Sequence, residues 1–116
     1  MLSLTCFILG DDAHRKFTVK IDKTENVDAL KDLIMQKNLS LLGNVDVKNI
    51  DLWQVSLPID DFEIQLRNLK LGDYTKLVSY KKLTIFSKDV ADDCLHIIAK
   101  APESWYVAKF FSSERY

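Results

Sequence analysis

Residues 17–34 read FTVKIDKTENVDALKDLI, and the hydrophobic period changes inside this stretch. Its first five residues alternate apolar and polar side chains, which is typical of a strand with one buried face. From Val27 onward the apolar residues recur at helical spacing, with Leu30 and Ile34 at positions i+3 and i+7. Leu33 widens this apolar stripe. The stretch therefore predicts a strand that is followed directly by one amphipathic helix.

Polar residues at both ends of this helix fit the chemistry of helix termini. Thr24 or Asn26 can act as the N-cap, because a side-chain oxygen there accepts a hydrogen bond from a free backbone N–H. Glu25 and Asp28 lie where the helix dipole favours acidic side chains. Asn38 is a suitable stop, so we expect the helix to end there.

A first strand is predicted before this stretch, at residues 2–9. Alternation places four of its residues on one face: Leu2, Leu4, Cys6 and Ile8. Gly10-Asp11-Asp12 supplies turn chemistry, so the first two strands are expected to form a hairpin. The chain start has no basic region and no obvious small-residue cleavage site, which favours a strand over a signal peptide. No apolar run approaches the roughly 20 residues that a membrane span needs.

The remaining chain gives weaker signals. Residues 39–49 are expected to be irregular, and a third strand is predicted at residues 50–58, where proline ends it. Residues 62–71 fit either a short strand or a loop that packs onto the core. A last strand is predicted at residues 94–99, with Leu95, Ile97 and Ala99 facing inward, before Pro102 stops it.

One amphipathic helix between two pairs of strands has one apolar stripe to bury, and the available surface is the face of a mixed sheet. The predicted fold class is α+β, a ubiquitin-like β-grasp with a mixed sheet packed on one main helix. A length of 116 residues suits one domain. We place this domain at residues 1–102 and interpret residues 103–116 as a C-terminal tail or the start of a linker.

Composition argues against several function classes. The hydrophobic fraction of 47% and the charged fraction of 28% are those of a globular domain. The net charge of −1 makes nucleic acid an unexpected partner. Only three glycines occur, and none builds a phosphate-binding loop. We therefore expect no cofactor.

The sequence offers neither a set of residues for catalysis nor enough ligands for a metal site. The two histidines are His14, in a turn, and His96, in the last predicted strand, and neither is placed beside a nucleophile. Cys94 and His96 share a strand face, whereas Cys6 should point to the opposite face, and a structural zinc site needs four ligands. We expect no enzyme and no metal site, with Cys6 in the core and His96 on the sheet surface.

The outer face of the sheet is the best candidate for a binding surface. If alternation holds, this face presents apolar and aromatic side chains, and exposed clusters of that kind mark contact sites. The candidate partner-binding residues are Phe7, Leu9, Leu52, Trp53, His96 and Ile98. The alternative is that another segment, such as the loop after Pro58 or the C-terminal tail, covers them.

Three segments resemble the ubiquitin-like N-terminal domain of Crinkler effectors, a fungal and oomycete family. Residues 52–61, LWQVSLPIDD, are similar to a stretch of the fungal members, and residues 96–102, HIIAKAP, resemble the motif that closes this domain. Residues 19–24, VKIDKT, lead into the helix as in the family. The resemblance runs from about Leu2 to Pro102.

This resemblance implies a ubiquitin-like, non-enzymatic domain that contacts either a host protein or a second copy of itself. It also implies secretion and entry into host cells, including the host nucleus. The oomycete LFLAK motif, which the family links to entry, would fall on residues 52–56, where only Leu52 is identical. The 116 residues do not include the variable C-terminal effector domain of the family, so we expect either an N-terminal domain taken from a longer protein or a short member of the family.

An intracellular adaptor of the Ras-binding or front-to-back type is the alternative function. That class needs a basic cluster on the second strand, here Lys16 and Lys20, and an acidic cluster elsewhere, here Asp60, Asp61 and Glu63. Self-association of this kind should weaken at high salt, because salt screens exposed charge pairs.

Overall fold

The computed structural model describes residues 2–12, 14–43, 45–60, 62–78, 80–86, 94–102 and Trp105. Within this part the strands are β1 (Leu2–Ile8), β2 (Phe17–Ile21), β3 (Asp51–Pro58), β4 (Thr75–Lys76) and β5 (Cys94–Lys100). The α-helices are α1 (Val27–Lys37), α2 (Leu39–Leu42) and α3 (Phe62–Arg67). Short 3-10 helices are η1 (Val47–Asn49), η2 (Leu71–Asp73) and η3 (Leu83–Ile85).

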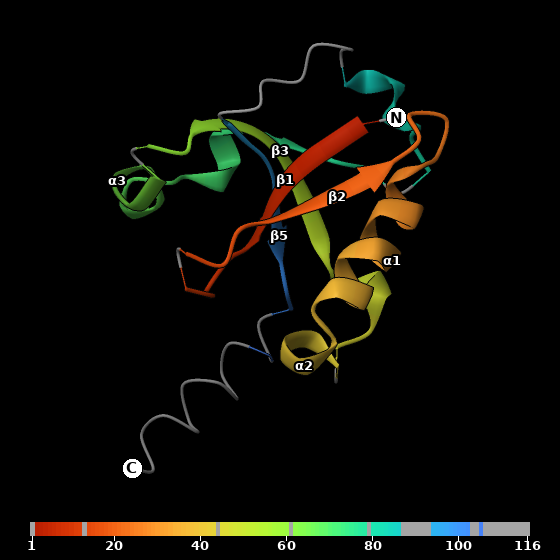
Figure 1. Cartoon of the computed structure of the whole chain (residues 1–116), viewed down its shortest axis with the longest axis horizontal. Coiled ribbons are helices and arrows are strands. Elements are labelled where there is room, and N and C mark those ends of the chain that lie inside the picture. The colour runs from red at the N-terminus through yellow and green to blue at the C-terminus, as the bar shows by residue number, and fades with distance from the viewer. Residues whose placement is uncertain are drawn as a thin grey trace.

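The five strands form one mixed sheet in the order β2-β1-β5-β3-β4. β1 pairs antiparallel with β2 and parallel with β5, while β3 pairs antiparallel with both β5 and β4. The parallel pairing of β1 with β5 joins the N-terminal hairpin to the last strand (Figure 1). The sheet is therefore complete only when both ends of the domain are present. The α+β class with a mixed sheet is confirmed, and the closer assignment to a ubiquitin-like β-grasp stays a prediction.

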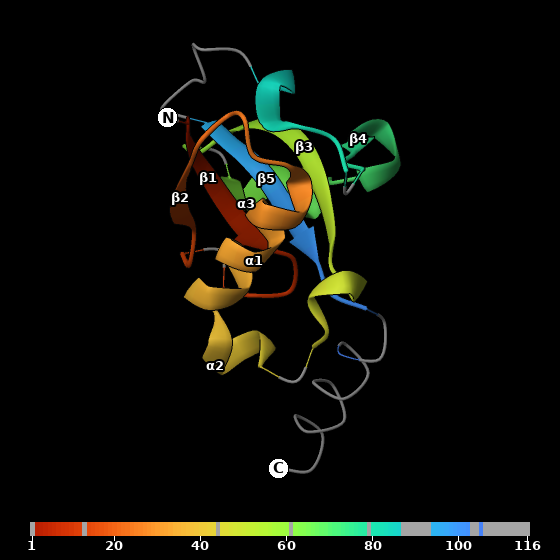
Figure 2. The same cartoon turned by 90° about the vertical axis from the view of Figure 1, so that its right-hand side faces the viewer.

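Helix α1 covers one face of this sheet, here called the inner face (Figure 2). Asn26 is its N-cap, and its side-chain oxygen accepts a hydrogen bond from the Ala29 N–H at 3.0 Å. Asn38 ends the helix, and its backbone N–H donates to the Met35 carbonyl. Val27, Leu30 and Ile34 are buried against residues of β1, β2 and the inner side of β5, as the helical spacing predicts.

Helix α3 lies against the opposite face of the sheet, here called the outer face (Figure 1). Residues 62–71 were expected to form a strand or a loop, but they fold into α3 and lead into η2. A second cluster of buried side chains fills the space beneath them: Phe7, Val55, Leu57, Phe62, Leu95 and Ile98. The sheet therefore has an apolar cluster on each face.

Two other segments also differ from the expectation. Residues 39–49 were expected to be irregular, yet they contain α2 and η1, and Leu42 is buried in the inner cluster. Strand β4 was not anticipated, because two residues give no periodic signal. Trp105 belongs to the predicted tail. Its indole N–H donates to the Leu41 carbonyl at 3.2 Å, and its ring packs on the inner cluster. The rest of residues 103–116 lies outside the described residues.

Candidate functional site

The six candidate partner-binding residues do not form an exposed surface on this chain. Phe7 and Ile98 are buried in the outer cluster, and Leu9 and Trp53 pack partly buried against it. Leu52 lies on the other side of the sheet, in the inner cluster. The expected exposure is wrong for Phe7 and Ile98, because α3 and the segment after it cover the outer face. It is also wrong for His96, which is buried within β5. Leu52, which alternation did not place on the outer face, is buried on the inner face. A partner-binding role for these six residues stays a prediction.

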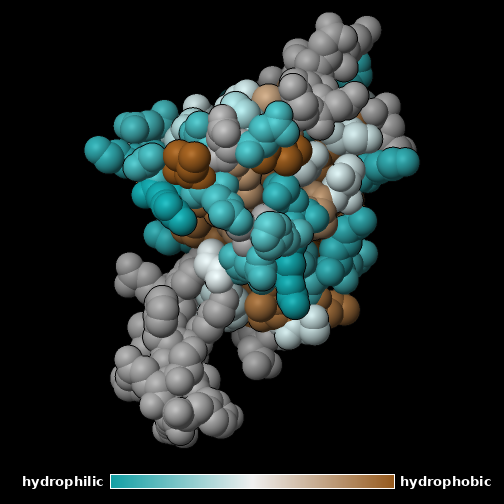
Figure 3. Space-filling model, turned by 60° about the vertical axis from the view of Figure 1, so that its left-hand side comes forward, coloured by the Kyte–Doolittle hydropathy of each residue, from teal (hydrophilic) through white to brown (hydrophobic). Residues whose placement is uncertain are grey.

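Phe62 anchors this cover. It is 3% exposed, and its ring meets that of Phe7 edge to face, with the centroids 5.0 Å apart. Further along the cover, four apolar or aromatic side chains pack against the same cluster: Leu66, Leu69, Leu71 and Tyr74. The surface above them is mostly hydrophilic, with apolar side chains in separate spots (Figure 3). The loop after Pro58 was the expected alternative cover, and α3 follows that loop.

His96 was predicted on the sheet surface, but it is only 6% exposed. The Thr5 backbone N–H donates to its Nδ1 at 2.9 Å, which requires an unprotonated Nδ1. The register of β3 on β5 shifts between Gln54 and Leu57, opposite this residue. On the far side of the shift Leu95 joins the outer cluster, so the prediction that Leu95 faces inward is wrong. The imidazole thus satisfies a backbone donor where the strand changes face.

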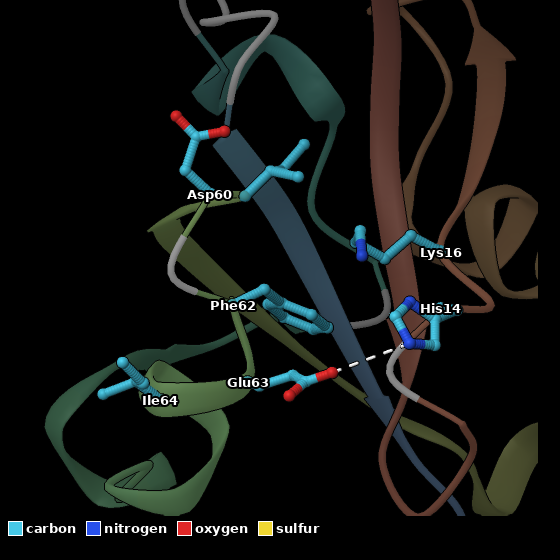
Figure 4. Close-up of a pocket in the computed structure, with 7 residues that line it drawn as sticks. His14, Lys16, Asp60, Phe62, Glu63 and Ile64 are labelled. Carbon is cyan, nitrogen blue, oxygen red and sulfur yellow. Dashed lines mark ion pairs between the residues drawn. The ribbon is translucent and has the colours of Figure 1, made fainter.

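A shallow pocket of about 280 Å³ lies where the hairpin loop meets the start of α3 (Figure 4). The His14 Nε2 lies 3.6 Å from the Glu63 Oε1, and the Lys16 Nζ lies 4.5 Å from the centre of the Phe62 ring. Ile59, Asp60 and Ile64 complete the lining. These contacts hold the first helical turn of the cover against the β1–β2 loop.

This pocket also bears on the charge-based adaptor hypothesis. Lys16 from its basic cluster lines the same pocket as Asp60 and Glu63 from its acidic cluster. Front-to-back association needs the two signs on separate faces, so that they meet between copies. Here these three groups lie close together within one molecule. Asp61 lies outside the described residues, and the adaptor function itself stays a prediction.

A second hollow, of about 440 Å³, lies between β2 and α1, and sequence reasoning missed it. Its lining comprises Lys20, Ile21, Asp22, Glu25, Ala29, Asp32 and Leu33. Two hydrogen bonds from Thr24, one from its backbone N–H and one from its hydroxyl, lower the pKa of Asp22. Leu33, at the margin of the apolar stripe, is half-buried here and reaches the surface. This hollow is called the β2–α1 groove below.

The described residues contain no group of three or more histidine, cysteine, aspartate or glutamate side chains arranged to hold a metal ion. Neither Cys6 nor Cys94 takes part in a disulfide bond. Burial raises the pKa of the Cys6 thiol to about 12, although Lys37 acts in the opposite direction. Within the same described part, no helix is long and apolar enough to cross a bilayer.

Trp53 contributes an unusual feature to the outer cluster. Its indole N–H is buried and has no hydrogen-bond partner among the residues that the structure describes. The Lys76 Nζ lies 5.9 Å from the centre of the Trp53 ring and forms an ion pair with Asp51 at 3.3 Å. The ring is therefore held between the apolar cluster and an exposed charge pair.

The fold defines the class of protein as an α+β domain whose sheet is covered on both faces. The two hollows described above lie at the sides of the sheet, one at the β1–β2 loop and one between β2 and α1. The chain matches the family model described as the Crinkler effector protein N-terminal domain over residues 2–100. It therefore belongs to the Crinkler family, and the predicted family membership is confirmed.

One curated relative aligns with most of this chain, while the chain covers only a small part of that relative. The chain is 36% identical over 104 residues to Crinkler effector protein 1 of Rhizophagus irregularis, an alignment that covers 89% of this chain. It spans 22% of the length of that relative, about a fifth. No solved structure matches the chain.

Proposed function

We propose that this chain is the non-enzymatic, ubiquitin-like N-terminal domain of a longer Crinkler-type effector and that it acts by binding proteins. The supporting observation is the extent of the family match, which spans residues 2–100 and thus all five strands of the sheet. Most of the relative's length lies outside the matched region. A compact domain joined to a larger region suits a role in contact and delivery.

The state of the reactive side chains supports a non-enzymatic role. His96 accepts a backbone hydrogen bond through Nδ1, so this nitrogen is already engaged. The buried Cys6, with a pKa of about 12, is a poor nucleophile, because the thiolate is the reactive form. Both groups serve the packing of the sheet.

Delivery is the second part of the proposal. The word effector in the name of the family and of its relative describes a protein that acts on another organism. We infer that the N-terminal domain directs secretion and entry into host cells, with the host nucleus as one destination. Its protein partner would be either a host protein or a second copy of the chain.

A split fluorescent reporter tests the delivery step. The 116-residue chain, fused to one reporter fragment, is produced in secreting cells that grow beside receiving cells carrying the other fragment. Fluorescence should appear in the receiving cells, and it should disappear when the fused chain carries Leu30→Asp, which places a charge in the inner cluster. Equal fluorescence with the reporter fragment alone would contradict a role of this domain in delivery.

A further inference from the structure

The two edges of the sheet differ. β4 is two residues long, and its Lys76 is paired with Asp51, so this edge is short and charged. β2 is five residues long, and β1 is the only strand that pairs with it in the described part of the chain. Figure 2 shows no described helix or strand beyond its outer edge. In an edge strand, backbone N–H and C=O groups that point away from the neighbour are open to pairing with another chain.

The β2–α1 groove runs beside this open edge. Ile21 is buried at its base, and Ala29 and Leu33 are half-buried, so their side chains offer apolar surface to the groove. An edge strand next to an apolar groove is the arrangement in which extended peptides add a strand to a sheet. The backbone supplies hydrogen bonds, and alternate side chains of the peptide enter the groove.

The charge around the groove favours one kind of peptide. The carboxylates of Asp22, Glu25 and Asp32 are exposed, and the Lys20 ammonium is the one basic group in the lining, which gives a net charge of −2. Complementary charge speeds association and selects the partner, and its contribution falls with salt. The matching pattern has apolar residues and arginine or lysine residues in turn at every second position, so that both lie on the face that meets the groove.

We propose that the β2 edge and the β2–α1 groove bind an extended basic segment of a partner protein, which pairs with β2 as a further strand. Alternate side chains of this segment face the groove. The apolar ones among them lie over Ala29 and Leu33, and the basic ones among them face Glu25 and Asp32. This inference rests on the proposed role in protein contact, but it does not depend on delivery into host cells.

Fluorescence anisotropy tests the proposal with a labelled peptide that has lysine and valine in turn at every second position and threonine between them, so that both face the groove. We expect saturable binding that weakens about five-fold with either Glu25→Lys or Asp32→Lys, and about ten-fold with Leu33→Gln, which removes apolar surface without adding charge. Asp73→Lys is the matched control, because Asp73 is exposed in η2, ahead of β4 at the other edge of the sheet. It should leave the affinity unchanged. Circular dichroism of each variant checks that the fold is intact.

Amide hydrogen exchange locates the bound peptide. Pairing with the open edge should slow exchange at alternate residues of 17–21. No saturable binding, equal binding of the same peptide with glutamate in place of lysine, or equal weakening by Asp73→Lys would overturn the proposal. A dimer of the chain that Leu33→Gln dissolves would show a second copy as the occupant and would also overturn it. Loss of reporter delivery with intact peptide binding would contradict the proposed function alone.

Discussion

The side chains on the two faces of the sheet are equally buried from solvent, but different kinds of segment cover them. On the inner face, the 11-residue α1 is capped at both ends and buries a regular stripe. On the outer face, the six-residue α3 and the 3-10 turn after it form the cover, with Phe62 as the anchor. Leu30 of α1 is 0% exposed, and Phe7 of β1, which lies beneath α3, is 1% exposed. The comparison shows that a sheet face can be sealed by a segment that has no long periodic pattern.

The largest expected effects come from truncating one buried side chain on each face. Phe7→Ala should lower the free energy of unfolding by about 4 kcal/mol and Leu30→Ala by about 3 kcal/mol, because each leaves a cavity in a packed cluster. Urea unfolding followed by tryptophan fluorescence measures both. A loss below about 1 kcal/mol for Phe7→Ala alone would show that the outer face is an open surface rather than a core.

A smaller effect is expected from the one buried thiol of the inner cluster. The folded Cys6 keeps its proton up to about pH 12, whereas the unfolded thiol releases it above its ordinary pKa. The unfolded state then binds fewer protons, so stability falls as the pH rises from about 8.5 toward 12. The loss at pH 10 should be about 2 kcal/mol.

Cys6→Ala provides the control for this pH dependence. It keeps every other titrating group, so the difference between the two unfolding profiles isolates Cys6. Parallel profiles between neutral pH and about pH 10 would contradict the burial of the thiol. A thiol reagent should also modify the half-buried Cys94 of the folded protein well before Cys6.

Much of the inner half of the molecule could be predicted from the sequence. The period change after residue 21 located β2 and α1, and Asn26 and Asn38 are the caps that the structure uses. These features are local, because a strand or a helix of several turns repeats its signal along the chain. The bounds of β1, β3 and β5 follow within about two residues for the same reason.

The outer half could not be predicted in this way. α3 has fewer than two turns, so its apolar residues show no repeat, and Phe62 is recognisable as an anchor only once Phe7 faces it. The shift of register opposite His96 breaks the alternation that placed Leu95 inward. The β2–α1 groove depends on how far α1 stands from β2, which is a property of packing between distant segments.

His96 lies where the alternation breaks, and its replacement gives the next effect in size. His96→Leu keeps much of the volume but removes the acceptor of the Thr5 N–H, which should cost about 1–2 kcal/mol. His96→Gln retains an acceptor and should recover part of this loss. Urea unfolding measures the cost, and faster exchange of the Thr5 amide hydrogen locates it. Equal stability of wild type and His96→Leu would contradict a structural role for this hydrogen bond.

The smallest effect on the free energy of unfolding is expected from the ion pair between His14 and Glu63, which both line the pocket at the β1–β2 loop. His14 and Glu63 are both exposed, and exposed ion pairs contribute little. Glu63→Gln should change the free energy of unfolding by less than about 1 kcal/mol at low salt and by less at high salt. Thermal unfolding at the two salt concentrations checks this. A larger loss would mean that charge, rather than the Phe62 ring, fixes the cover.

The central claim is that α3 seals the outer face, and two residues of the same helix test it most directly. Phe62 is 3% exposed and Ile64 is 57% exposed. Urea unfolding should show that Phe62→Ala costs about 3 kcal/mol or more, while Ile64→Ala costs less than about 1 kcal/mol. Small losses for both variants would contradict the account, because the outer face would then be open to a partner.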